Sequence, residues 1–157
     1  GTGVAALAAH TVEIFDNRIR DNETVNLGVI SYYTTELEFD DPSYDAYADT
    51  LYIHGNTFSG GGTEPTDELG FLVVQGLSTI MDAPIIVPDI VIDGWKNPDL
   101  VVNGELPADK KICIQSNGDA DFADLDRAND FANVSQDLAP HDCSHAPLPK
   151  VTIPGVE

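Results

Sequence analysis

The chain has 157 residues, of which 42% are hydrophobic, with 13 Gly and 10 Pro. This length and composition fit one turn-rich globular domain with a single sizeable core and exclude a disordered chain. The 27 acidic residues against 7 basic ones give a formal net charge of −20, which repels phosphate backbones, so we expect no nucleic-acid partner. No apolar run approaches the ~20 residues of a spanning helix, so we expect no membrane span.

A repeat runs through the chain. The segments VEIFDNRI (residues 12–19), LYIHGNTF (51–58) and ICIQSNGD (112–119) share an apolar first residue, Ile at the third position and Asn at the sixth. Their apolar residues alternate with period two, which predicts strands. A glycine-led apolar segment precedes each of them: GVAA from Gly3, GVIS from Gly28 and GFLV from Gly70. We interpret these as strands too.

Short strands recurring in fixed order are typical of a solenoid in which each unit covers the next. The sequence therefore predicts an all-β parallel β-helix of about three coils. The equivalent asparagines, Asn17, Asn56 and Asn117, are expected to stack as a hydrogen-bonded ladder.

We interpret residues 1–157 as one domain with insertions near 34–49 and 76–111 and a C-terminal tail or cap over 119–157. Solenoid insertions project from one face, where binding sites are commonly built. The aromatic residues Tyr44, Tyr47 and Trp95 of these loops are therefore candidate binding residues. IIVPDIVIDGW, in the later insertion, is expected to be an extended or edge segment because it contains Pro88.

The first strand is expected over residues 3–9, with Val4 and Leu7 pointing inward. Its unpaired edge predicts coverage by a partner protein, by a second copy of the chain, or by earlier coils of a longer protein.

Two cysteines, Cys113 and Cys143, have no CxxC spacing and indicate either one disulfide or two unrelated thiols. We favour a disulfide that ties the last repeated strand to the tail. The motif HDCSH offers His141, Cys143 and His145 to Zn²⁺ or copper, but a fourth ligand is missing and a disulfide would remove the thiolate.

Catalytic signals are weak. Arg18 and Arg20 flank Ile19 and could take a proton in a uronate lyase, although an ordinary solvated strand face gives the same pattern. Calcium is the one expected cofactor candidate, either in the insertion at residues 40–49 or in an acidic run that departs from the EF-hand order. The run contains Asp119, Asp121, Asp124 and Asp126.

The pieces NRIRDN, NTFSGGGT and the closing DC and PLP resemble the C-terminal part of a family of exported right-handed parallel β-helix repeat proteins of Gram-negative bacteria. The resemblance covers nearly the whole chain. It implies a right-handed β-helix and a periplasmic, cell-surface or extracellular location, and it implies no particular activity.

Together these observations favour a non-enzymatic structural or binding module whose inserted loops contact a partner protein or a glycan. The alternative is a polysaccharide-active enzyme of the lyase or epimerase type.

Overall fold

The three repeated segments form one parallel sheet in the computed structural model, which describes residues 1–150. Its strands are β2 (His10–Phe15), β5 (Asp49–His54) and β8 (Ile112–Gln115), in the order β2-β5-β8. Their register places Val12, Leu51 and Ile112 side by side. Each sequence repeat therefore supplies one strand, and equivalent positions of the repeats are register partners in the sheet.

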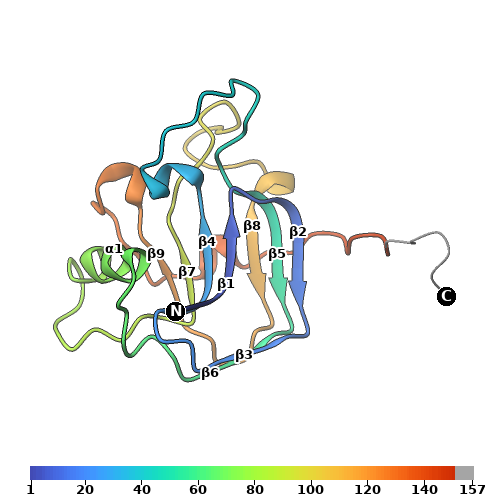
Figure 1. Cartoon of the computed structure of the whole chain (residues 1–157). Helices are drawn as coiled ribbons and strands as arrows, with labels where there is room; N and C mark the ends of the chain where they lie inside the picture. Colours follow the sequence, from blue (N-terminus) through green and yellow to red (C-terminus); the bar gives the residue numbers. More distant parts are fainter. Residues whose placement is uncertain (151–157) are drawn as a thin grey trace, which may run out of the picture.

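Two further parallel sheets complete the strand framework (Figure 1). The four-stranded sheet has the order β1 (Thr2–Leu7), β4 (Val25–Ile30), β7 (Ile90–Ile92) and β9 (Phe122–Asp124). The two-stranded sheet pairs β3 (Arg18–Arg20) with β6 (Thr57–Ser59). Four short 3₁₀ helices lie in the connections: η1 (Tyr32–Thr35), η2 (Ala108–Lys110), η3 (Arg127–Asn129) and η4 (Ala139–His141).

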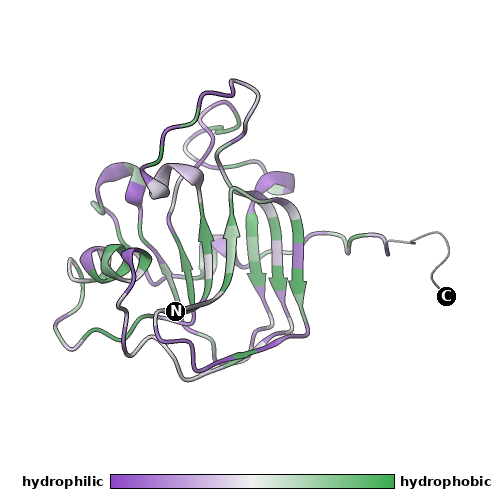
Figure 2. Cartoon of the chain, in the orientation of Figure 1, coloured by the Kyte–Doolittle hydropathy of each residue, from purple (hydrophilic) through white to green (hydrophobic). Residues whose placement is uncertain are grey.

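The main core lies between the three sheets. The four-stranded sheet contributes Leu27 and Ile90, the three-stranded sheet Leu51 and Ile53, and the two-stranded sheet Ile19, all of them buried. In Figure 2 the hydrophobic colour is strongest along the strands, and on the strands of the three-stranded sheet it alternates with polar colour. Alternate side chains of β5 are buried, as expected for a strand with one face on the core.

A second core covers the outer face of the four-stranded sheet. Helix α1 (Glu68–Leu77) packs Val73 and Leu77 toward Val25 and Val91. Asp67 caps the helix by accepting a hydrogen bond from the Gly70 backbone N–H at 2.7 Å. Every residue of β4 is buried because apolar groups cover the sheet on both faces.

The architecture corrects the predicted fold class. The prediction of an all-β right-handed parallel β-helix is wrong: the strands form three separate parallel sheets, and an α-helix contributes to the second core, which makes this a small α/β protein. GFLV from Gly70, interpreted as a strand, lies inside α1, where the Asp67 cap and the i, i+4 spacing of Val73 and Leu77 favour helix.

Other boundaries also differ from the expectations. Residues 90–92, expected to be an extended or edge segment, form a central strand between β4 and β9. Part of the predicted tail, residues 122–124, is strand β9, whereas residues 151–157 lie outside the described residues. Val4 packs against the main core as predicted, but Leu7 is 45% exposed and Ala6 points inward in its place.

The predicted asparagine stack is present in the turns that follow β2, β5 and β8. The Asn17 side-chain amide donates to Asn56 Oδ1 at 3.1 Å, and the Asn56 amide donates to Asn117 Oδ1, also at 3.1 Å. Backbone N–H groups reinforce the stack, since those of Asn17 and Asn56 donate at 3.0 Å to the next asparagine. Asn56 also donates to the Ile14 carbonyl at 2.9 Å.

A second polar stack lies at the start of the strands β4, β7 and β9 of the four-stranded sheet, and sequence reasoning missed it. Asn22 donates to Asn26 Oδ1 at 2.8 Å, and Asn26 donates to Asp89 Oδ1 at 2.7 Å. The Asp89 backbone N–H then donates to Asp121 Oδ1 at 2.7 Å. Asn26 lies within β4 directly before Leu27, and Asp89 and Asp121 directly precede the register partners of Leu27, which are Ile90 and Phe122. This shared position was the available sequence signal.

The disulfide between Cys113 and Cys143 is confirmed, with a sequence separation of 30 residues. It joins β8 to the segment after η4, so the C-terminal connection is fastened to the three-stranded sheet. Its presence rules out the Cys143 thiolate as a metal ligand.

Strands β1, β2 and β3 each form one of the two edges of their sheets. The predicted contact of this edge with a partner protein or a second copy stays a prediction. None of the helices within residues 1–150 has the length and apolar character needed to cross a bilayer.

We expect Asn56→Ala to lower the free energy of unfolding by roughly 3 kcal/mol, because it leaves several buried donors and acceptors unpaired. Asn17→Ala should cost about 1 kcal/mol because its side chain lies at the exposed end of the stack. Urea titrations of both variants would measure the difference. Equal losses would contradict the role assigned to the central asparagine.

Removing the disulfide in a Cys113→Ser/Cys143→Ser double variant should cost roughly 3 to 4 kcal/mol, as the chain-entropy model gives for a closed loop of this length. The effect arises from the unfolded state, so far-ultraviolet circular dichroism of the native protein should change little. An unchanged urea midpoint would show that the 113–143 segment is already constrained in the unfolded chain.

Candidate functional site

The inserted loops gather aromatic side chains on one end of the molecule. Segment 36–48 follows η1, and segment 93–107 follows β7; both project from the same end of the sheets, at the top of Figure 1. The predicted binding residues Tyr44, Tyr47 and Trp95 all lie in these two segments.

Tyr33 is the centre of the aromatic contacts. Its ring centroid lies 5.1 Å from those of Tyr47 and Trp95 and 5.7 Å from that of Phe39. Phe39 contacts Tyr44 edge-on, with centroids 5.4 Å apart. Such edge-on and tilted pairs stabilise aromatic clusters beyond the area they bury. We call this group, with Tyr32, the aromatic cluster; its members are Tyr32, Tyr33, Phe39, Tyr44, Tyr47 and Trp95.

Part of the aromatic cluster faces solvent. Tyr33 and Phe39 are each 38% exposed and Tyr44 is 40% exposed. Two open hollows of about 660 and 330 Å³ border Tyr33, and the acidic residues Asp40 and Asp99 help to line them. Both hollows are wide open to solvent, so a ligand there would lie on the surface rather than be enclosed. The surface therefore combines exposed aromatic rings with carboxylate acceptors.

A smaller cavity of about 190 Å³ borders Trp95. Lys96, Lys111 and Glu105 line it together with His141, and both lysines approach Glu105, at 3.7 and 3.8 Å. The Trp95 indole N–H is buried and has no hydrogen-bond partner within residues 1–150.

The buried carboxylate of Asp93 holds the two loop segments together. Its Oδ2 accepts hydrogen bonds from the Ser31 N–H and the Thr34 hydroxyl, both at 2.6 Å, and its Oδ1 accepts from the Trp95 N–H at 3.2 Å. One carboxylate thus fixes the start of η1, which carries Tyr33, relative to Trp95. Sequence reasoning missed Asp93 because its partners are far apart in the chain.

Two pKa shifts mark this region. Burial raises the pKa of the Asp93 carboxyl, and the hydrogen bonds from Thr34 and Ser31 oppose that shift. Burial, aided by Tyr33 and by the negative charge of Asp45, raises the pKa of Tyr47 to about 12. Asp93 is buried and Tyr47 is half-buried, so the base of the aromatic cluster is shielded from water although its outer rings are exposed.

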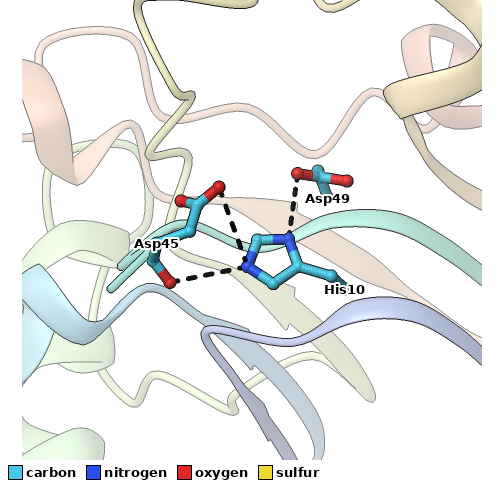
Figure 3. A group of neighbouring side chains, drawn as sticks. All are labelled: His10, Asp45 and Asp49. Carbon is cyan, nitrogen blue, oxygen red and sulfur yellow. Dashed lines mark hydrogen bonds and ion pairs between the residues drawn. The ribbon is translucent and has the colours of Figure 1, made fainter. Parts of the chain in front are cut away.

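A second group, at the side of the same loop, was not predicted. His10, Asp45 and Asp49 place one ligand atom each within 4.8 Å of one another. Figure 3 shows the His10 ring between the two carboxylates, with Nδ1 3.0 Å from Asp49 Oδ2. Only the tertiary structure brings His10 to the loop, because Asp45 and Asp49 lie 35 and 39 positions away in the chain.

The other candidate residues are not assembled into a site. Arg18 and Arg20 are exposed on β3, at the bottom of Figure 1 and away from the loops, and Arg20 lies 3.9 Å from Asp21. His141 and His145 contact the backbone carbonyls of Ile112 and Lys111, at 2.9 and 2.8 Å.

Three carboxylates of the predicted calcium run accept hydrogen bonds from different backbone N–H groups and do not converge on one point. Asp124 accepts from the Asp126 N–H at 2.9 Å, and Asp126 accepts from the Asn133 N–H at 3.1 Å. Asp121 belongs to the second polar stack, and Asp119 is exposed. Within residues 1–150, no metal-sized group includes any of these four aspartates. The predicted calcium site in this run therefore has no support in the structure.

No family model, curated protein or solved structure matches the chain. The resemblance to exported repeat proteins therefore stays a prediction, and the function must be argued from the residues themselves.

The raised pKa of Asp93 predicts the direction in which its contribution to the free energy of unfolding changes with pH. The folded protein binds the Asp93 proton more tightly than the unfolded chain, so its contribution to stability is largest below the unfolded pKa and is lost as pH rises through the folded pKa. The difference in unfolding free energy between wild type and Asp93→Asn should therefore shrink as pH rises from about 4. Denaturant titrations at several pH values would measure it; a difference that grows with pH would mean that the carboxylate is stabilised in its charged form.

Proposed function

We propose that this protein is a non-enzymatic extracytoplasmic binding module whose loop end binds a neutral glycan. The observation that carries the proposal is the aromatic cluster, in which residues from η1 and two insertions meet on an exposed surface beside carboxylates. Aromatic faces pack against the apolar C–H faces of sugars, and carboxylates accept hydrogen bonds from sugar hydroxyls.

The charge of the chain selects among glycans. With a formal net charge of −20 and Asp40 and Asp99 beside the hollows, the surface repels polyuronates and sulfated chains. A neutral polysaccharide carries no such penalty. The same field, with Arg18 and Arg20 away from the aromatic cluster, gives a uronate lyase no support.

Hydrogen bonds to the sheets and to the C-terminal part of the chain hold the loops that carry the aromatic cluster in place. Asp93 anchors both loop segments, and Arg127 donates to Glu36 at 3.1 Å near the start of the first insertion. A fixed loop loses little conformational entropy on binding. The disulfide fits the exported location that we propose, because such bonds persist in oxidising compartments.

Binding of soluble neutral polysaccharides, such as β-glucan, xylan and mannan, is expected to retard the protein in affinity gels, whereas polygalacturonate should not. Tyr44→Ala should weaken this binding at least about tenfold, since exposed aromatic anchors dominate such surfaces. Phe71→Ala is the matched control, because Phe71 is a 65% exposed aromatic residue on α1, outside the aromatic cluster.

Three results would count against the proposal. They are no retardation by any neutral polysaccharide, retardation that Tyr44→Ala leaves unchanged, and equal losses in Tyr44→Ala and Phe71→Ala. Circular dichroism of each variant would show that the fold is intact before binding is compared.

A further inference from the structure

His10 lies between two groups of oxygen atoms. Its Nδ1 is 3.0 Å from Oδ2 of Asp49, and its Nε2 is 3.4 Å from the Asp45 carbonyl oxygen and 3.9 Å from Asp45 Oδ2 (Figure 3). The His10 side chain is 33% exposed and that of Asp49 only 5%. The imidazole is therefore fixed from the buried side and open to solvent on the Asp45 side.

Asp49 determines which ring nitrogen carries the proton. Its Oδ1 already accepts from the Thr50 hydroxyl and lies 3.6 Å from Lys110 Nζ, while Oδ2 faces His10. A carboxylate accepts hydrogen bonds and an imidazole nitrogen must supply one, so we assign the proton to Nδ1. This leaves the lone pair of Nε2 in a neutral ring pointing toward the Asp45 oxygens.

A lone pair that faces two oxygen atoms is electrostatically unfavourable unless a hydrogen-bond donor or a positive charge lies between them. A bridging water, a second proton or a metal cation can fill that place. Zinc binds imidazole nitrogen and carboxylate oxygen at about 2.0 to 2.2 Å, and two such ligands at a tetrahedral angle lie about 3.4 Å apart. The distance from Nε2 to the Asp45 carbonyl oxygen, 3.4 Å, matches that spacing. The Asp45 carboxylate oxygen Oδ2, at 3.9 Å from Nε2, would have to move closer by about 0.5 Å to share the same cation.

We propose that His10 Nε2 and Asp45 bind a first-row divalent cation of the Zn²⁺ type, with water completing the coordination. Asp49 is a positioning residue: a carboxylate on the far nitrogen is the usual outer partner of a metal-binding histidine. Imidazole beside carboxylate favours zinc or a neighbouring transition metal over calcium, which prefers ligand sets made entirely of oxygen.

The cation would join β2 to the insertion. His10 begins β2, whereas Asp45 lies between Tyr44 and Tyr47 in the loop. The only other side-chain bond to the Asp45 carboxylate that spans distant parts of the described chain is a long one, 3.5 Å, from Asn97. Metal binding would therefore hold the loop against the sheet. This inference stands on the His10 geometry and does not depend on glycan binding.

The test is isothermal titration of the metal-free full chain with ZnCl₂, with CaCl₂ as the comparison. We expect one Zn²⁺ site per chain and no competition from millimolar Ca²⁺. His10→Ala should abolish the site and Asp45→Asn should weaken it. Asp49→Asn should lower affinity about 10- to 100-fold while retaining binding, as expected for an outer partner.

His54→Gln is the matched control, because His54 Nε2 contacts a single carboxylate oxygen, that of Glu13 at 2.9 Å. Its Zn²⁺ affinity should equal that of the wild type. Nitrogen NMR of the imidazole gives a second measurement: on zinc addition the Nε2 resonance of His10 should shift while Nδ1 keeps its proton.

Several results would overturn the proposal: equal Zn²⁺ binding by wild type and His10→Ala, equal losses in His10→Ala and His54→Gln, or a site that prefers Ca²⁺. A His10 ring that keeps protons on both nitrogens in excess zinc at neutral pH would also overturn it, since the second proton would then supply the positive charge.

Discussion

The structure depends on the stacking of equivalent side chains from one strand to the next. In the three-stranded sheet the register places Ile14, Ile53 and Ile114 side by side, and the asparagines at the following turns hydrogen-bond to one another. Each side-chain amide both donates and accepts, so a column of asparagines pairs its own members and also satisfies turn backbone groups. This constraint fixes the register and therefore what lies inside the main core.

The second polar stack extends the same constraint to the four-stranded sheet. Asn26 is 2% exposed and is fully enclosed by hydrogen-bonding partners, which is how a buried amide is accommodated. Burial raises the pKa of Asp89 within this stack, and the neighbouring Asp121 adds to the effect. Columns of polar side chains thus border the sheets at positions where the chain turns, leaving one end free for long insertions.

The proposed binding surface and the proposed metal site both occur at that free end. The framework supplies fixed attachment points, Asp93 under the aromatic cluster and Asp49 under His10, and the insertions supply the groups that face solvent. Both anchors are buried carboxylates, 6% and 3% exposed, that orient a neighbouring loop through hydrogen bonds. Among the acidic residues within positions 1–150, these two are the buried ones.

The sequence by itself determined the repeated strands, their register, the asparagine stack, the disulfide pairing and the aromatic character of the insertions. Each of these is encoded by local alternation or by residue identity at a fixed spacing. Tertiary structure alone decided the rest: the division into three parallel sheets, the helix at Gly70, and the meeting of His10 with Asp45. At Gly70 the helix cap of Asp67 and the apolar stripe of α1 outweighed the likeness of GFLV to the strand segments GVAA and GVIS. His10 and Asp45 are 35 positions apart, and a contact over that distance leaves no periodic signal in a single sequence.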